Sequence, residues 1–273
     1  MPASESPIRP PSWRDDLDLI ADAARAAGER ALAFFRKDPD VRWKNGGHSP
    51  VSAADYAAND VLKDMLLKAR PNYGWLSEET DDDPARLSCE TVFVVDPIDG
   101  TRAFIAGRDV WCVSVAVVHR GRPVAGVLVA PALKETFLAR IDGPAVKNGA
   151  TMALAQGPTR SPLRVAASER MIGGLDRGFR AGVERVGHVP SLAYRLAMIA
   201  DGTIDATLVM SSSHDWDLAA ADLILARAGG GLKNLDGSAL TYNRPTVAHS
   251  VLCAATAPVL DGLVAAAQAL EGH

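Results

Sequence analysis

The chain has 273 residues, a formal net charge of -4 and 48% hydrophobic residues, which is typical of a globular protein with one large or two medium domains. Its pI near 5.9, without a basic run, leaves no electrostatic footprint for nucleic acid or for an anionic membrane surface. We therefore expect neither partner. A small anionic substrate would need metal ions or a local positive site.

Cysteine content and the N-terminal sequence indicate where the protein works. The three cysteines, Cys89, Cys112 and Cys253, are too few and too scattered for a disulfide framework. Residues 1–12 contain no apolar segment of a signal peptide, and no apolar run approaches the roughly 20 residues that cross a bilayer. We expect a reducing, cytoplasmic location.

Two amphipathic helices are predicted at the start of the chain. The first begins at Ser12 and ends near Phe35, and residues 42–47 are expected to form a turn region. The second begins near Ser52, where Asp55 has the spacing of a capping box, and stops at Pro71. Two such helices in succession predict a sheet for them to cover.

Short β-branched runs follow and predict that sheet. Because only short turns separate them, the strands are expected to be antiparallel. We assign residues 1–150 to an N-terminal α+β half whose strands after residue 90 are Thr91–Val95, Trp111–Val118, Val124–Ala130 and Thr136–Arg140.

After about residue 150 the pattern alternates between strands and helices, which predicts a C-terminal α/β half over residues 151–273. Gly229 is expected to give the helix before it a left-handed cap. The expected elements are strand Leu163–Ala167, broken helix Glu169–Gly187, helix Leu192–Ala200, strand Ile204–Met210, helix Asp217–Ala228, strand Ser250–Ala255 and helix Val259–Leu270.

The strongest chemical signal is the segment Asp96-Pro97-Ile98-Asp99-Gly100-Thr101, which directly follows an apolar strand. Pro97 is expected to end the strand, and the two carboxylates can then converge with the Ile98 carbonyl as a third oxygen. Hard cations such as Mg²⁺ take such ligands. The structural alternative is a turn at Asp99-Gly100 that Asp96 caps.

Two other carboxylates stand at the ends of predicted elements. Glu78 and Glu79 follow the short apolar strand at residues 73–77, and Asp217 opens a helix. Each has a structural alternative, because the glutamates also suit a solvated loop and Asp217 also suits a helix cap or first turn.

Three separated motifs, in order, resemble the inositol monophosphatase-like superfamily of Mg²⁺-dependent phosphomonoesterases. They are Leu76-Ser77-Glu78-Glu79, Asp96-Pro97-Ile98-Asp99-Gly100-Thr101, and Trp216-Asp217-Leu218-Ala219-Ala220 with Ala228-Gly229-Gly230. A fourth segment, residues 50–55, looks most like the bacterial 3′(2′),5′-bisphosphate nucleotidase branch. The resemblance spans nearly the whole chain and implies a layered αβαβα sandwich, with the active site between the two halves.

The resemblance also implies a metal centre of two or three Mg²⁺ ions. Glu78, Asp96 and the Ile98 carbonyl would bind one ion. Asp96, Asp99 and Asp217 would bind a second, and Glu78 would reach a third. Asp55 would support this centre from outside, although its capping-box spacing explains it equally well.

Further roles follow from the same resemblance. Gly100 and Thr101 would bind the substrate phosphate beside Asp99 and Asp217, and the Thr101 hydroxyl with Glu78 would orient and help deprotonate the attacking water. His214 would touch the leaving group, and its alternative is a capping or surface role.

The expected activity is hydrolysis of a small phosphorylated metabolite, and we favour conversion of adenosine 3′,5′-bisphosphate to AMP and phosphate. Alternatives are inositol-1-phosphate or another sugar or histidinol phosphate, and an interaction protein that keeps the fold without catalysis. The survival of Glu78, Asp96, Asp99, Thr101 and Asp217 disfavours that last alternative. The resemblance further implies lithium inhibition and a homodimer.

Overall fold

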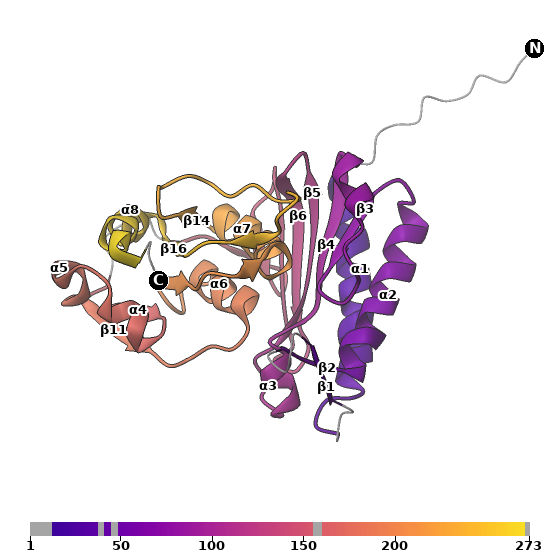
Figure 1. The fold of residues 1–273 in the computed structure, drawn as a ribbon, viewed down its shortest axis with the longest axis horizontal. Helices are drawn as coiled ribbons and strands as arrows, with labels where there is room; N and C mark the ends of the chain where they lie inside the picture. The colour runs from indigo at the N-terminus through magenta and orange to yellow at the C-terminus, as the bar shows by residue number, and fades with distance from the viewer. Residues whose placement is uncertain (1–12, 38–40, 45–48, 155–159, 271–273) are drawn as a thin grey trace, which may run out of the picture.

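A computed structural model describes residues 13–37, 41–44, 49–154 and 160–270. Five layers follow one another across the molecule (Figure 1), two helices, a seven-stranded sheet, two helices, a five-stranded sheet and a last group of helices. The predicted αβαβα architecture is confirmed. The N-terminal residues 1–12, used above for the expected location, lie outside the described residues.

The first layer consists of α1 (Trp13–Leu32) and α2 (Ala53–Ala69), as predicted. Both bury alanine and large aliphatic side chains against one face of the seven-stranded sheet. The expected turn at residues 42–47 is wrong in part, because β1 (Val41–Lys44) pairs antiparallel with β2 (Ser49–Ser52). Residues 45–48 lie outside the described residues. The turn prediction followed the glycines and neglected the strand preference of Val41 and Trp43.

The seven-stranded sheet runs in the order β3-β4-β5-β6-β7-β8-β9. It is antiparallel as expected, apart from the parallel pair β3 and β4 at one edge. Its strands are β3 (Gly74–Ser77), β4 (Thr91–Asp99), β5 (Cys112–His119), β6 (Arg122–Ala130), β7 (Glu135–Arg140), β8 (Ala145–Lys147) and β9 (Ala150–Met152). A 3₁₀ helix, η2 (Pro84–Ser88), connects β3 to β4.

The prediction that Pro97 ends its strand is wrong. Asp96 pairs with Ser114, and pairing resumes where Asp99 meets Cys112, so one extra residue of β4 forms a bulge. Proline cannot donate to the ladder, and a bulge accommodates it without ending the strand. The bulge lies between the two aspartates of the motif and changes the direction of the chain there.

The five-stranded sheet has the order β11-β10-β12-β16-β14 and mixes parallel and antiparallel pairs. The expected broken helix at residues 169–187 is wrong at its end, because two short helices are followed by strand β11. The strands are β10 (Leu163–Ala166), β11 (Val183–Val186), β12 (Ala206–Val209), β14 (Gly230–Asn234) and β16 (Leu252–Thr256), with a separate pair, β13 (Ser213–His214) and β15 (Ala248–His249).

The remaining helices lie between the sheets or outside the second one, except for the short helix after β4, which lies near β2 at one end of the first sheet. Gly229 adopts the left-handed conformation (φ 101°) that the sequence predicted. The helices are α3 (Thr101–Ile105), α4 (Glu169–Gly173), α5 (Arg177–Arg180), α6 (Leu192–Ala200), α7 (Asp215–Ala228) and α8 (Ala257–Ala266), followed by η3 (Gln268–Leu270). Helix α7 therefore begins two residues before the expected start, because His214 is its N-cap.

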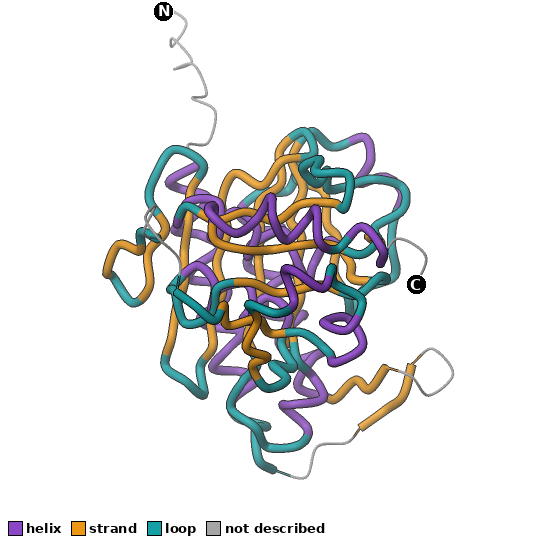
Figure 2. The backbone as a smooth tube through the Cα atoms, turned by 90° about the vertical axis from the view of Figure 1, so that its left-hand side faces the viewer, coloured by secondary structure: helices purple, strands orange, loops and turns teal. Residues whose placement is uncertain are grey.

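The central core joins both parts of the chain. Residues of β4 to β7 and of α6, α7 and β16 share one buried apolar cluster. A Cβ on Gly126 would come within 2.9 Å of the Ala220 carbonyl oxygen, so the glycine allows α7 to lie directly on β6. In the view turned by 90°, helices and strands overlie one another, and most loops lie at the rim (Figure 2). The division near residue 150 stays a prediction.

Among the described residues, no helix is long and apolar enough to cross a membrane.

Candidate active site

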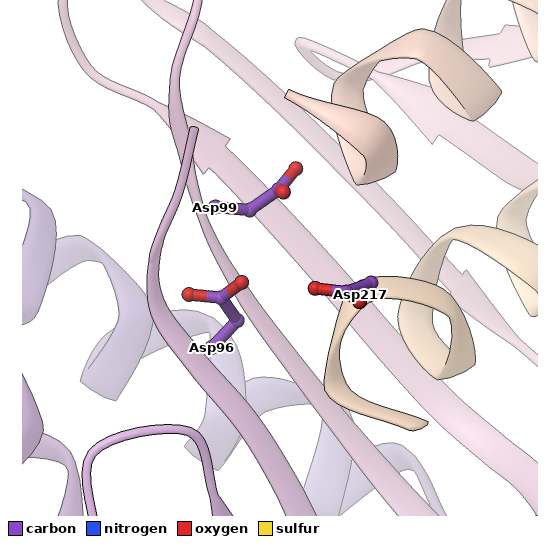
Figure 3. Close-up of side chains that lie close together, drawn as sticks. All are labelled: Asp96, Asp99 and Asp217. Carbon is purple, nitrogen blue, oxygen red and sulfur yellow. The ribbon is translucent and has the colours of Figure 1, made fainter. Parts of the chain in front are cut away.

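Three carboxylates from distant parts of the chain meet between the seven-stranded sheet and α7 (Figure 3). Asp96 and Asp99 stand on either side of the β4 bulge, and Asp217 lies in the first turn of α7. One ligand oxygen of each lies within 4.8 Å of the others. The structure thus brings together three of the four carboxylates that the resemblance assigned to metal.

Local hydrogen bonds hold each carboxylate in place. Asp96 accepts from the Ile98 N–H at 3.0 Å, and Asp217 accepts from the His214 N–H at 2.7 Å. The cap expected as the alternative role of Asp217 is therefore present, but it uses only one of the two carboxylate oxygens, Oδ2.

The side chain of Asp99, the last residue of β4, contacts the N-terminus of α6. The Ser191 hydroxyl and the Ala193 N–H, the latter at 2.7 Å, donate to its Oδ2, and the Leu192 N–H donates to Oδ1 at 3.2 Å. These donors favour the ionised carboxylate. A simple turn at Asp99-Gly100, the structural alternative, would not require these three donors. The N-terminus of α6 therefore fixes the Asp99 side chain.

The three carboxylates destabilise one another when all are ionised. Burial, followed by the charges of Glu78, Asp99 and Asp217, raises the pKa of Asp96 well above its usual range. Burial and the charge of Asp99 raise the pKa of Asp217 to about 7. A divalent cation would relieve this repulsion, and buried oxygen ligands are what Mg²⁺ binds. The residues present therefore fit the metal that the sequence implied.

Glu78 follows β3 and lines the same cavity as Asp99 and Asp217. It is not part of the three-carboxylate cluster found among the described residues, and it acts on the pKa of Asp96 through its charge. The cavity has a volume of about 760 Å³, and its wall also includes Arg102, His188, Arg195 and His214. Acidic and basic groups thus face one space.

Asp55 and Thr101 form a hydrogen-bonded pair beside the cluster. The Thr101 hydroxyl lies 3.1 Å from Asp55 Oδ1 and 2.9 Å from the Ile98 carbonyl oxygen. The other oxygen of Asp55 accepts from the Ser52 N–H at 2.8 Å and the Ser52 hydroxyl at 2.6 Å. The capping box expected for Asp55 is therefore present on Oδ2, and support of a metal centre through Oδ1 stays a prediction. The sequence paired Thr101 with Glu78 and did not anticipate its bond to Asp55.

Gly100 allows the chain to turn from the bulge into α3. Its φ of 96° is left-handed, and a Cβ would lie 3.2 Å from the Val110 carbonyl oxygen. The Ala103 and Phe104 N–H groups close the helix on the Gly100 carbonyl. The first N–H groups of a helix have no acceptor within it, so those of residues 100 and 101 stay the predicted phosphate contacts.

His214 lies at the cavity wall and stacks on Trp216, with ring centroids 4.6 Å apart and planes 7° from parallel. Burial lowers the pKa of His214 below its ordinary value, although the charge of Asp215 opposes this. The surroundings of the ring therefore favour its neutral form. His214 is the N-cap residue of α7, and its backbone N–H donates to the Asp217 carboxylate, so the capping role is present. Contact of the ring with the leaving group stays a prediction.

Sequence reasoning gave no role to Ser191 or Arg195. Ser191 is fully buried against Asp99, and Arg195 lines the cavity with its Nε buried and, among the described residues, without a hydrogen-bond partner. Burial lowers the pKa of Arg195 while the charge of Asp99 opposes this. The available signal was a serine before a helix with an arginine one turn later, which is too common to point to a site.

With this geometry established, comparison with known proteins gives consistent matches. The model of the inositol monophosphatase family matches residues 13–272. A 3′-phosphoadenosine 5′-phosphate phosphatase of Mycobacterium leprae is 33% identical over 91% of this chain and 93% of its own length. An inositol-1-monophosphatase of Mesorhizobium japonicum is 31% identical over 81% of this chain and 86% of its own.

A solved structure gives the same result for the fold. The extragenic suppressor protein suhB from Bartonella henselae superposes with a TM-score of 0.81 at 25% sequence identity, and the match covers 94% of this chain and 99% of that one.

Proposed function

The chain belongs to the inositol monophosphatase family and is a phosphoric monoester hydrolase, and from that premise we propose that it converts adenosine 3′,5′-bisphosphate to AMP and phosphate. The family is metal-dependent, and Asp96, Asp99 and Asp217 form a cluster suited to a metal ion. We propose Mg²⁺ as that metal, with two or three ions held by these residues together with Glu78 and the Ile98 carbonyl. Bound cations would neutralise the phosphate and lower the pKa of the attacking water.

The protein itself supplies a route for the proton of that water. While the Thr101 hydroxyl donates to Asp55, its oxygen can accept a hydrogen bond from water. Burial raises the pKa of Asp55 above its ordinary value, despite the hydrogen bonds from Ser52 and Thr101. A carboxylate with a raised pKa is a better general base. We assign activation of the water to Thr101 and Asp55, in place of Thr101 and Glu78.

The observation that carries the choice of substrate is the position of Arg195. Its buried, unpartnered Nε lies in the wall of the cavity that contains the carboxylates. The cleaved phosphate would lie on the metal side with the N–H groups of Gly100 and Thr101. A second phosphate would satisfy the guanidinium, because arginine binds phosphate through charge-assisted hydrogen bonds. A monophosphate has no group for this position.

Apolar side chains in the wall of the cavity support a nucleoside. Met171, Leu208, Val209 and Met210 line it, and Met210 is 63% exposed. A nucleobase presents a flat apolar face that such side chains can cover. The M. leprae relative, which carries 3′-phosphoadenosine 5′-phosphate in its name, adds to this support.

Inositol-1-phosphate stays the second candidate, because the M. japonicum relative is an inositol-1-monophosphatase and the cavity is large enough for either substrate. Phosphate release from adenosine 3′,5′-bisphosphate, inositol-1-phosphate, histidinol phosphate and fructose bisphosphate, with and without Mg²⁺, separates them. We expect the highest kcat/KM for the nucleotide. A preference for inositol-1-phosphate would contradict the proposed substrate and leave the family activity intact.

Arg195→Met tests the assigned contact directly. We expect the ratio of kcat/KM for adenosine 3′,5′-bisphosphate to that for 3′-AMP to fall by about 10-fold, because only the former has a 5′-phosphate for the guanidinium. An unchanged ratio would show that Arg195 does not read the second phosphate.

The expected location and assembly are also proposals. All three cysteines are free, and Cys112 and Cys253 are buried, which supports the reducing cytoplasm as the place of action. The homodimer that the resemblance implied is tested by light scattering of the purified protein.

A further inference from the structure

A buried arginine lies outside the catalytic cluster in the 3₁₀ helix η2. The Arg86 side chain is 1% exposed and bonds to both oxygens of Asp82, at 2.5 Å through Nε and at 2.8 Å through one terminal nitrogen. This pairing lowers the pKa of Asp82. Asp82 stands four residues after Glu78, so the pair closes the loop that leaves β3 next to Glu78.

The same guanidinium crosses to a segment more than 150 residues away. It donates to Asn243 Oδ1 at 2.6 Å and to the Arg244 carbonyl oxygen at 3.1 Å. The Asn243 side-chain amide donates back to the Arg86 carbonyl at 3.4 Å. All three guanidinium nitrogens are used, and two different loops are joined by one side chain.

Asn243 then connects to the start of α7. Its backbone N–H donates to Asp215 Oδ2 at 2.7 Å, and His249 bonds to Asp215 Oδ1 at 2.7 Å. Asp215 is fully buried and is the first residue of α7, two positions before Asp217. A continuous set of contacts therefore runs from the loop after Glu78, through Arg86 and Asn243, to the helix that presents Asp217.

We propose that Arg86 is a positioning residue that fixes the separation between Glu78 and Asp217, and thereby the affinity of the site for divalent cations. The inference rests on the cation-binding role of these carboxylates proposed above. Partners behind the direct ligands of a metal commonly change its affinity by about 10- to 100-fold. Arg86 is suited to this role because its planar fork holds two loops at once, which a lysine cannot reproduce.

Arg86→Lys and Asn243→Gly test the proposal from both sides of the connection. Glycine suits position 243, because Asn243 has a φ of 55° and the backbone N–H to Asp215 is kept. We expect each variant to weaken Mn²⁺ binding to the metal-free protein by about 10-fold, measured by electron paramagnetic resonance. Because both variants break the same connection, the double variant should weaken Mn²⁺ binding little more than either single variant does.

Arg70→Lys is the matched control. Arg70 pairs with buried Asp16 at 2.8 Å and joins α2 to α1, with no contact to the cavity. It should lower the melting temperature like Arg86→Lys and leave Mn²⁺ binding unchanged. If Arg86→Lys binds Mn²⁺ as the wild type does, or if Arg70→Lys weakens binding equally, the proposal is wrong.

Mn²⁺ binding by the wild type separates a failure of the proposed metal centre from a failure of the proposed role of Arg86. A wild-type protein that binds no Mn²⁺ would overturn the metal centre and the positioning role together. A wild type that binds Mn²⁺, with both connection variants binding equally well, would overturn only the role of Arg86. A kinetic readout adds to this, since the Mg²⁺ concentration for half-maximal activity should rise more than KM for the nucleotide.

Discussion

Two groups of close carboxylates in this protein differ in whether a protein cation compensates their charge. Glu135 and Asp201 both contact Lys147 Nζ, at 2.7 and 2.8 Å, and the Lys147 ammonium also lies over the Phe137 ring. Burial lowers the pKa of Lys147, but hydrogen bonds to Asp201 and Glu135 outweigh it and raise that pKa overall. The charges of this group are compensated within the protein.

The catalytic cluster lacks such compensation. Within the part of the chain that the structure describes, no lysine or arginine forms an ion pair with Asp96, Asp99 or Asp217, although the charge of Arg195 acts on Asp99. Burial raises the pKa of each of the three carboxylates. Burying ionised groups without partners costs several kcal/mol. The difference teaches that carboxylates paired with a protein cation can stabilise the fold by themselves, whereas buried carboxylates without such an ion pair are suited to an external cation.

The largest effect is expected for Asp96→Asn. Loss of this proposed ligand should lower kcat/KM at least about 1000-fold, because a bound metal ion would stabilise the transition state by several kcal/mol. In chelator, the variant should melt no lower than the wild type, since it removes the most strongly repelled charge. Phosphate release and thermal unfolding check the two parts. If Asp96→Asn instead loses activity because it unfolds, Asp96 stabilises the fold as the Lys147 group does, and the contrast between the two groups is wrong.

Asp55→Asn should lower kcat about 100-fold by weakening the general base, while Mn²⁺ binding is kept. The control is Ser52→Ala, which removes hydroxyl contacts of the helix cap and leaves Asp55 Oδ1 next to Thr101. It should cost about 1 kcal/mol of stability and little activity. Equal kinetic losses in both variants would mean that Asp55 acts through the cap alone.

Lys147→Met should lower stability and leave catalysis nearly unchanged, which is the reverse of the effect expected for Asp96→Asn. We expect the free energy of unfolding to fall by about 2 kcal/mol, because two partly buried carboxylates lose their partner, with kcat/KM per folded molecule within about 3-fold of the wild type. Lys233→Met is a control, since Lys233 pairs with the exposed Asp261 and should cost less than about 1 kcal/mol. Urea unfolding measures both. A large catalytic loss in Lys147→Met would contradict a purely structural role.

The smallest effect is a pH dependence of the metal-free protein. The folded-state pKa of Asp217, about 7, lies above its ordinary value of 3.8, so its contribution to stability is complete below about pH 4 and is lost as pH rises toward 7. In chelator, the melting temperature should fall by a few degrees between pH 5 and 8. Asp217→Asn should flatten this slope, and Mg²⁺ should offset it. A slope unaffected by Mg²⁺ would argue against the cluster as its source.

Much of this organisation follows from local sequence. Apolar periodicity predicts helices α1 and α2, and β-branched runs between turns predict the strands β4 to β7. The motif at residues 96–101 indicates two of the three clustered carboxylates, because two aspartates three residues apart across a turn can converge on one cation. Asp217 could be joined to them only through the resemblance, since no local pattern brings together residues more than 100 positions apart.

What the sequence did not reveal depends on tertiary contacts. The bond between Thr101 and Asp55 joins two segments 46 residues apart, and the unpartnered Nε of Arg195 has meaning only beside the cavity. Pro97 was expected to end a strand, because its effect on the ladder is local, whereas the bulge depends on β5 as partner. The same holds for Arg86, whose partner Asn243 lies 157 positions further along the chain.

The most direct test of the central claim is phosphate release from adenosine 3′,5′-bisphosphate by one preparation, first in chelator and then after Mg²⁺ is restored in excess. We predict no turnover above background in chelator and full recovery with Mg²⁺, with AMP as the nucleotide product. Turnover that continues at the same rate in chelator would contradict the account, because the reaction would then need no cation at Asp96, Asp99 and Asp217.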